Sequence, residues 1–389
     1  MRATTRMGAA AVAFALALSG CSTSGTDDDG GGGSGDDASG SSGGSEELRP
    51  VTLQLQWVPQ AQFAGYYAAI DQGFYEDEGL DVTIQEGGVD IVPQDVLANG
   101  EVDYAISWVP KVLGSIEQGA GITDVAQIFE RSGTLGVSFK EAGITSPADF
   151  KGKNVGSWGF GNEWELFAAM QQEGVTLDDI SLVQQAFDMS GLLQGDVDVA
   201  QAMTYNEYAQ LLETTNPETG ELYQPEDLNV IDYNDVGTAM LQDAIWAQTS
   251  ELEDPAYQEQ TVDFIKASIK GWVYARDNPE EAATIVTEAG SILGQSHQLW
   301  MTNETNKLIW PTTAGGIGMI DEAAWEQTVE IAMGTENETG ATIISSEPPE
   351  TAYTNEYVEQ ALDELREEGV DVEGADWEPI EVTLNEGGN

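Results

Sequence analysis

The sequence predicts an α/β protein of two lobes, each a mainly parallel sheet flanked by helices. Short β-rich runs alternate with helical stretches after residue 50, and this alternation occurs in two successive series. Such alternation is typical of parallel sheets covered by helices. About 340 residues follow the N-terminal region, which is enough chain for two lobes.

The first series is expected to build the first part of lobe I from residues 49–140. Runs rich in β-branched and apolar residues predict strands, and the stretches between them have helical periodicity. The predicted strands are 51–57, 80–85, 104–107 and 124–129, and the predicted helices are 61–72 and 91–99.

The second series begins after Thr145-Ser146-Pro147, a helix-entry signal with proline near the first turn. Residues 141–235 are expected to form lobe II. Its predicted strands are 153–157, 180–185, 199–203 and 230–233, and its predicted helices are 162–173 and 205–214.

The remainder, residues 236–389, is expected to return to lobe I. It contains an apolar strand candidate at 239–248 and helical patterns such as 261–276 and 321–332. A long helical return after two sheet-building series places the two crossings between the lobes near Phe139 and Tyr233.

The N-terminus predicts secretion. Arg2 and Arg6 precede an apolar run over 7–18, and Leu18-Ser19-Gly20-Cys21 closes it, so residues 1–20 are expected to be a signal peptide. The apolar run is shorter than the roughly 20 residues that a membrane span needs. Cys21, the only cysteine of the chain, sits where a bacterial lipobox has its lipidated residue, which predicts a lipid anchor. The alternative is a secretory peptide that happens to contain a cysteine.

Residues 21–48 predict how the protein is attached, and the charge of the whole chain indicates its partners and its medium. After Cys21, the segment is almost entirely Gly, Ser, Asp and Thr, which predicts a flexible tether. The net charge of −56 is spread along the chain, so nucleic acid and anionic lipid are poor partners. Spread acidity favours adaptation to a salty medium, where screening suppresses self-repulsion. No metal site is expected, since Asp27-Asp28-Asp29 lacks the glutamate that closes a calcium loop.

The candidate ligand site lies in the loops that follow the predicted strands, because open α/β sheets bind ligands outside the carboxyl ends of their strands. Four strand ends offer a ring beside a hydrogen-bonding group. This set suits a planar heteroaromatic ligand, with rings stacking on its faces and amides or carboxylates contacting its edge. The candidates are Trp57, Gln62, Tyr66, Trp108, Trp158, Asn162, Glu163, Tyr205, Asn206 and Glu207.

Each candidate also has a structural interpretation. An aromatic residue in such a loop can simply pack, and Tyr66 and Tyr67 cannot easily both face a cleft from one helix. Glu163 and Glu207 can be first-turn acids that the helix dipole stabilises, and Asn162 can be an N-cap. The glycine-rich run 156–161 is followed by acids rather than by a lysine or arginine, which favours a neutral ring over a phosphate.

Five motifs, taken in order, resemble one branch of the periplasmic-binding-protein superfamily. They are LQLQWVP at 53–59, GFYEDEGLDV at 73–82, GEVDY at 100–104, SPADFKGKNVG at 146–156 and GDVDV at 195–199. This branch contains binders of thiamine pyrimidine precursors, riboflavin and aliphatic sulfonates, and a related fungal pyrimidine synthase. The resemblance covers about residues 51–250. Within the branch, residues 60–67 and 160–163 look more like the riboflavin-binder type.

The resemblance implies a type II periplasmic binding protein that closes on its ligand like a hinged trap. The family's ring-stacking positions fall on Trp57, Trp108, Trp158 and Tyr205. It implies a monomer without a cofactor, lipid-anchored to the outer face of the cytoplasmic membrane, that delivers a heteroaromatic vitamin or precursor to the permease and ATPase of an ABC importer. An aliphatic sulfonate or taurine-like solute is the alternative ligand.

Two other functions remain open. A synthase-like enzyme of the same fold needs a cysteine-rich motif, a lysine that holds pyridoxal phosphate and an active-site histidine. Here the sole cysteine is Cys21 and the sole histidine, His297, is expected on the surface of a helix. The pattern Gly-x-Ser-x-Gly occurs only at 40–44, inside the Gly/Ser-rich linker and not at a strand-to-helix elbow, and no His-Glu-x-x-His motif is present, so an enzyme is not expected. A ligand-binding sensor that signals to a membrane kinase would have the same sequence features as an import protein.

Overall fold

A computed structural model of the chain describes residues 47–389. The predicted signal peptide, Cys21 and the linker up to residue 46 lie outside the described residues. Within residues 47–389, two α/β lobes are present, and no helix is both long and apolar enough to cross a membrane.

Lobe I is built on a five-stranded sheet in the order β2-β1-β3-β10-β4. The first three strands of the chain pair in parallel, whereas β10 runs antiparallel to both β3 and β4. The strands are β1 (Arg49–Gln54), β2 (Leu80–Gln85), β3 (Tyr104–Trp108), β4 (Ile122–Gln127) and β10 (Asp243–Gln248).

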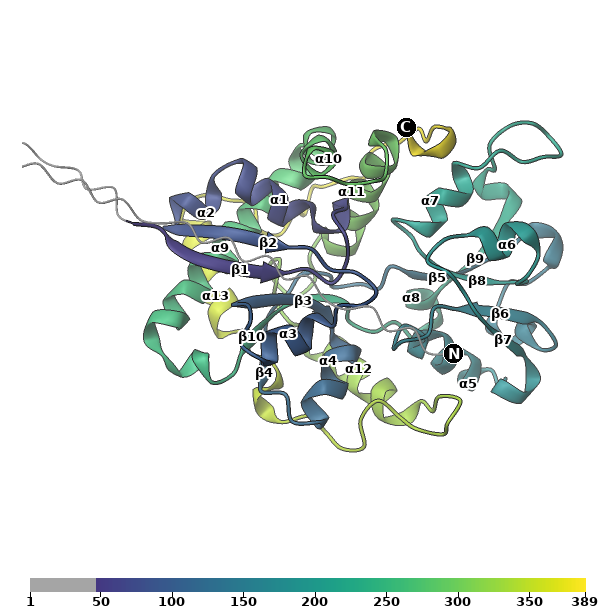
Figure 1. Ribbon diagram of the computed structural model, residues 1–389, viewed down its shortest axis with the longest axis horizontal. Coiled ribbons are helices and arrows are strands. Elements are labelled where there is room, and N and C mark those ends of the chain that lie inside the picture. The colour runs from purple at the N-terminus through teal and green to yellow at the C-terminus, as the bar shows by residue number, and fades with distance from the viewer. Residues whose placement is uncertain (1–46) are drawn as a thin grey trace, which may run out of the picture. The chain divides into compact units, whose positions relative to one another are not determined.

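Strands β3, β4 and β10 are buried on both faces of the lobe I sheet, whereas β2 at its edge alternates between buried and exposed residues. Alternate residues of β10 enter different cores: Ile245 packs beneath α9 (Pro255–Asp277), and Trp246 packs beneath α4 (Val109–Glu117) and α12 (Glu322–Gly334). Figure 1 shows the purple and blue strands of this lobe beside the green and yellow C-terminal helices. The C-terminal third of the chain packs on the sheet of lobe I.

One helix pair on the sheet packs backbone to backbone. Helix α1 (Ala64–Asp71) follows a short 3-10 turn, η1 (Ala61–Phe63), and lies against α9. A Cβ added to Gly271 of α9 would lie 2.0 Å from the carbonyl oxygen of Gly65 in α1. Glycine is required at this contact because any side chain would separate the two helices.

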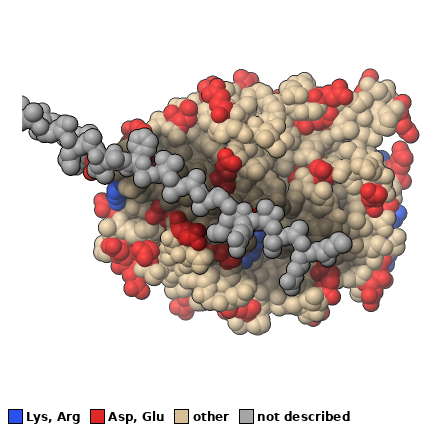
Figure 2. Space-filling view, viewed as in Figure 1, with Lys and Arg blue, Asp and Glu red and all other residues tan. Residues whose placement is uncertain are grey.

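The other helices of lobe I complete its two outer layers. They are α2 (Phe74–Asp77), α3 (Pro93–Ala98), α10 (Pro279–Glu288), α11 (Gln295–Ile309) and α13 (Glu356–Glu367). Acidic side chains are scattered over the visible face of the molecule with few basic ones between them (Figure 2).

Lobe II contains a three-stranded sheet in the order β8-β5-β9 and a parallel pair, β6-β7. A parallel bridge between Val155 of β6 and Val199, directly before β8, joins the pair to the three-stranded sheet. The strands are β5 (Thr134–Phe139), β6 (Asn154–Ser157), β7 (Ser181–Gln184), β8 (Ala200–Met203) and β9 (Leu228–Asp232). The helices are α5 (Trp164–Gln172), α6 (Ser190–Gln194), α7 (Glu207–Leu212) and α8 (Tyr233–Val236).

The structure corrects the position of the first crossing. Strand β5 was not predicted, and the segment that contains it was expected in lobe I, but it pairs with β8 and β9 of lobe II. The chain therefore crosses between β4 and β5, before Phe139, and returns between α8 and β10, after Tyr233. An apolar run indicates a strand but not the sheet that it joins.

Each lobe contains one reversed strand, β5 or β10, and each is the first strand after a crossing. The other strands of each lobe share one direction. The predicted two-lobed α/β fold is confirmed, with sheets that contain both parallel and antiparallel pairs.

Candidate ligand-binding cleft

A cleft of about 700 Å³ lies between the lobes, and both lobes line it. Lobe I contributes Trp57, Trp108, Lys111 and residues 88–94, which include the end of the β2–α3 loop and the start of α3. Lobe II contributes loops that follow β6, β7 and β8. The cleft therefore lies at the carboxyl ends of strands, where the α/β topology predicts a ligand.

The structure brings eight of the ten predicted residues to the wall of this cleft, and two lie elsewhere. Tyr66 is 1 % exposed and packs edge-on against Trp272 in the lobe I core, with ring centroids 5.6 Å apart. Glu163 is buried at the N-cap of α5, where its Oε2 accepts a hydrogen bond of 2.9 Å from the amide of Gly161. The lining residues are Trp57, Gln62, Trp108, Trp158, Asn162, Tyr205, Asn206 and Glu207.

A ring that the sequence analysis missed joins the two lobes across the cleft. Phe187 follows β7 and stacks on Trp158, with centroids 6.0 Å apart and planes at 19°. It also contacts Trp57 of lobe I, with centroids 4.9 Å apart. Phe187 follows a predicted strand, so the strand-end rule that selected the other residues would have found it.

Phe160 has the most unusual backbone of the cleft. Its φ of 54° is in the left-handed region, between Gly159 and Gly161 at 65° and 84°. The side chain is 82 % exposed although it lines the cleft. Left-handed backbone is costly for a bulky residue and concentrates at functional sites, so this loop is a candidate ligand contact.

A carboxyl group organises the amides on the lobe I side of the cleft. Asp243 is 2 % exposed, and its Oδ2 accepts a hydrogen bond of 2.7 Å from Nε2 of Gln62. The side-chain amide of Gln56 donates to Oδ1 of the same residue, and Nε2 of Gln60 donates to Oε1 of Gln62 at 2.7 Å. Burial raises the pKa of Asp243 to about 7, opposed by the Gln62 bond and by the positive charge of Lys111. Asp243 opens the apolar strand β10, and no local sequence pattern marks it as a cleft residue.

Lys111 brings a positive charge to the cleft. Its Nζ lies 4.8 Å from the ring centroid of Trp108, a cation–π geometry. Burial lowers the pKa of Lys111 to about 8, while Asp243 and Glu163 oppose that shift. The ion pairs found within residues 47–389 do not include Lys111. A ligand oxygen can therefore accept a hydrogen bond from it.

His297 is buried, so its predicted surface position is wrong. The residue is 1 % exposed, and its Nδ1 lies 2.8 Å from Oε1 of Glu213. Its Nε2 lies 3.1 Å from Oδ1 of Asn206, whose Nδ2 donates to Oε1 of Glu207 at 2.9 Å. Burial raises the pKa of Glu207 to about 7, opposed by its bond from the amide of Met203 and by His297. The sequence could not reveal these contacts because His297 lies 84 residues from Glu213 and 91 from Asn206.

Both crossings between the lobes are held by one buried carboxyl group. Oε2 of Glu165, in α5, accepts from Oγ of Ser132 in the first crossing at 3.0 Å. Its Oε1 accepts from the amide of Met240 in the second crossing at 2.6 Å. Burial raises the pKa of Glu165 to about 7, against the lowering effect of its hydrogen bonds.

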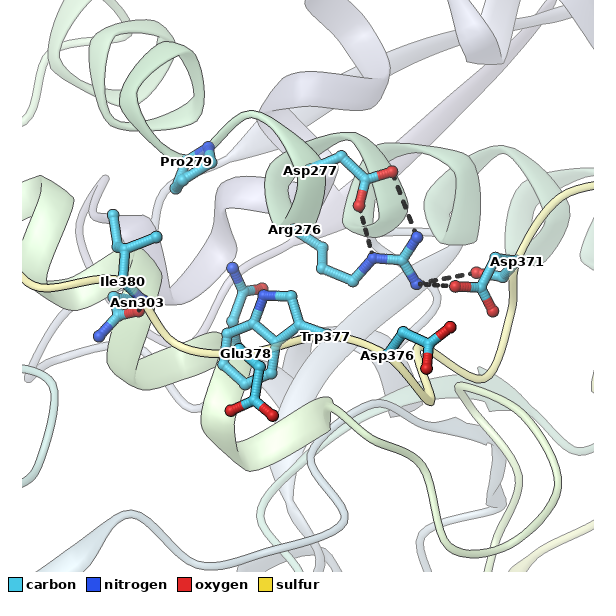
Figure 3. A pocket seen from close by; sticks show the side chains of 10 residues that line it. Arg276, Asp277, Pro279, Asn303, Asp371, Asp376, Trp377, Glu378 and Ile380 are labelled. Atoms are coloured by element: carbon cyan, nitrogen blue, oxygen red, sulfur yellow. Dashed lines mark hydrogen bonds and ion pairs between the residues drawn. The ribbon is translucent and has the colours of Figure 1, made fainter.

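A second cavity, of about 380 Å³, lies under the C-terminal segment and contains none of the predicted residues (Figure 3). Its main cation, Arg276, already pairs with Asp277 at 2.7 Å and with Asp371 at 3.2 Å, and its guanidinium lies over the ring of Trp310. Arg276 thus ties the C-terminal segment to α9. Within the described part of the chain, no cluster of acids, cysteine or histidine suits a metal ion.

Known proteins resemble the chain over most of its length. A formylaminopyrimidine-binding protein of Halalkalibacterium halodurans is 24% identical over 247 residues, which cover 62% of this chain and 71% of the relative. The riboflavin-binding protein RibY of Chloroflexus aurantiacus is 26% identical over 330 residues, 80% of this chain and 86% of the relative.

A solved structure has the same fold. The putative sulfonate-binding protein SsuA of Methylobacillus flagellatus superposes with a TM-score of 0.59 at 18% identity, over 87% of this chain and 99% of the other. The resemblance to this superfamily branch, identified from five motifs, is confirmed. The family model described as NMT1/THI5 like matches residues 60–282, more than half of the chain, and the chain belongs to that family.

Proposed function

We propose that this chain is the extracytoplasmic solute-binding lipoprotein of an ABC importer, and that it captures a small heteroaromatic compound, a riboflavin-like vitamin or a pyrimidine precursor of thiamine. The observation that carries the proposal is the cleft, where Trp57 and Trp108 of lobe I and Trp158 and Tyr205 of lobe II line one cavity. Aromatic walls with a few polar groups suit a planar ring that stacks on its faces and forms hydrogen bonds at its edge.

The relatives support this choice of ligand. Two of them are named as binders of a formylaminopyrimidine and of riboflavin, both of which contain heteroaromatic rings. The sulfonate-binding neighbour supports only the fold, so an aliphatic sulfonate remains the alternative ligand.

Binding would use the closing movement that two lobes allow. The ligand would dock on Trp57 and Trp108, and contacts from Trp158, Asn162 and Tyr205 would then stabilise the closed state. A ligand shifts this equilibrium only by its preference for the closed state. The two crossings beside Glu165 would serve as the hinge.

Binding is favoured over the synthase-like alternative. The only histidine of the chain, His297, contacts Glu213 and Asn206 and does not line the cleft. An active-site histidine would need to reach a bound substrate.

A thermal-shift and calorimetric screen of residues 48–389 in high salt tests the ligand. The panel is riboflavin, thiamine, its pyrimidine precursors and alkyl sulfonates. A ligand at 100 times its dissociation constant should stabilise the protein by about 2.7 kcal/mol. A hit on a heteroaromatic compound supports the proposal, a hit on a sulfonate alone replaces the ligand class, and no response from the whole panel contradicts it.

Variants of the cleft rings provide the control. Trp57→Ala and Trp158→Ala should each weaken binding by about 1 to 3 kcal/mol if the rings stack on the ligand. Trp377→Ala, in the second cavity, should leave the affinity unchanged. Unchanged affinity in both cleft variants would rule out stacking.

The lipid anchor has its own test. Cys21→Ser should move the protein from the membrane fraction to the soluble extracellular fraction and abolish labelling by a radioactive fatty acid. Retention of label in the variant would exclude Cys21 as the lipidated residue. Co-purification of the intact protein with a permease and its ATPase would support import, and capture of a sensor kinase instead would support signalling.

A further inference from the structure

Helix α11 presents one face to lobe II although it packs within lobe I. The helix lies against α10 and η1. Three of its residues, His297, Trp300 and Glu304, are spaced three and four positions apart and so share one face. Nε1 of Trp300 donates to the carbonyl of Thr204 at 3.0 Å, and Oγ1 of Thr204 donates to Oε2 of Glu304 at 3.4 Å.

His297 makes the most buried of these contacts. It lies between Glu213, directly after α7, and Asn206, directly before α7. The exposed fractions of these residues are 1 % for His297, 7 % for Glu213 and 8 % for Asn206. A hydrogen bond of this kind is strengthened by the low local dielectric, and each partner left without it would be a buried polar group without a bond.

The C-terminal segment covers this contact from outside. The amide of Asn385 donates to Oγ of Ser296 at 3.2 Å, and the amide of Gly387 donates to the carbonyl of Glu213 at 3.2 Å. A Cβ on Gly388, whose φ is 77°, would lie 3.0 Å from both His297 and Glu213. The backbone therefore closes over the pair and shields it from water.

His297 also orients a polar edge of the cleft. Oδ1 of Asn206 faces Nε2 of His297 and accepts from Nε2 of Gln210 at 3.2 Å. The amide nitrogen of Asn206 is thereby directed at Glu207, and Asn206 and Glu207 both line the cleft. A change at His297 removes one of the two contacts to Oδ1 of Asn206 and leaves this amide less firmly oriented.

We propose that His297 is a positioning residue that latches the two lobes together and fixes the Asn206–Glu207 edge of the cleft for the ligand. The second half of this inference rests on the proposed binding function, whereas the first half concerns the lobes alone. The latch holds the closed arrangement before any ligand arrives and determines how tightly the closed cleft retains it.

The latch can be measured without a ligand because Cys21 is the only cysteine of the chain. In a Cys21→Ser background, Asp81→Cys in lobe I and Asp178→Cys in lobe II introduce exposed positions for a pair of spin labels. Pulsed electron–electron distance measurements then report the separation of the lobes. His297→Ala should broaden the distribution of label-to-label distances toward longer values. It should reduce the closed population by roughly tenfold, because that is the effect expected from losing one buried hydrogen bond.

Thr302→Ala is the matched control. Thr302 is also a buried polar residue of α11, but its hydroxyl bonds to the carbonyl of Gln298 in its own helix. The distance distribution of this variant should match that of the parent. Opening in both variants would indicate general loosening of α11 and would overturn the latch, as would a His297→Ala distribution identical to the parent.

Glu213→Gln is the second variant, for use if His297→Ala does not fold. It keeps the size of the side chain but removes the charge beside His297, so it should also open the lobes. A closed distribution in this variant would overturn the proposal. The latch and the proposed ligand class can fail separately. If these variants open the lobes but the protein binds nothing in the screened panel, the latch is supported and the ligand class is contradicted.

Discussion

Glu165→Gln should change how stability depends on pH. The carboxyl group of Glu165 is 5 % exposed, and burial raises its pKa from 4.5 to about 7. Because the folded-state pKa is raised, the group's contribution to stability is fully present below pH 4.5 and is lost as the pH rises through 7. At about 1.36 kcal/mol per pKa unit, this loss is about 3 kcal/mol for the wild type.

Glutamine resembles the protonated carboxyl group and does not titrate. Its carbonyl oxygen can still accept from the amide of Met240, and its amide can donate to the hydroxyl of Ser132. We therefore expect similar stability of the two proteins near pH 4.5. The variant should gain about 3 kcal/mol relative to the wild type by pH 8 to 9.

Urea unfolding at constant high salt, from pH 4.5 to 9, measures this difference. Glu173→Gln is the matched control, because it makes the same replacement at an exposed position directly after the same helix. A free-energy difference between Glu165→Gln and wild type that stays constant across the pH range would refute the reasoning.

Three further predictions concern packing, strain and charge. Gly271→Ala should lower the free energy of unfolding by about 1 to 3 kcal/mol, because its Cβ would collide with Gly65; urea unfolding that matches wild type would contradict the close helix contact. Phe160→Gly should raise the free energy of unfolding by about 1 kcal/mol, because glycine adopts left-handed backbone without strain, and it should lower ligand affinity. A variant that is less stable than wild type would argue against backbone strain at this position. The melting temperature should rise with sodium chloride concentration, because salt screens the repulsion within a chain of net charge −56. A melting temperature that does not change with salt would exclude adaptation to salt.

The candidate cleft, the hinge and the latch meet at the boundary between the lobes, and Asn206 belongs to both the cleft and the latch. Phe187 contacts a ring of each lobe, Glu165 holds both crossings, and His297 joins α11 to the ends of α7. Ligand contacts in the cleft and polar contacts outside it would thus both affect the same open–closed equilibrium.

The strand-end rule located much of the cleft from sequence because it depends on chain order and direction, which local patterns reveal. Trp57 and Trp158 each follow a strand and Trp108 ends one, and the carboxyl ends of these strands face the cleft. Tyr66 was misplaced because α1 turns it toward Trp272, and the rotation of a helix relative to its neighbours is a property of packing. Glu163 was misplaced because its side chain turns back to its own loop.

The sequence by itself determined the alternation of strands and helices and the family motifs, since these depend on local periodicity and on residue identity. Only the tertiary structure decided that β5 belongs to lobe II, that Asp243 gathers the amides of Gln56 and Gln62, and that His297 lies between Glu213 and Asn206. These contacts join residues far apart in the chain. A polar residue in an apolar strand or a helix carries no local mark of the partner that folding will bring to it.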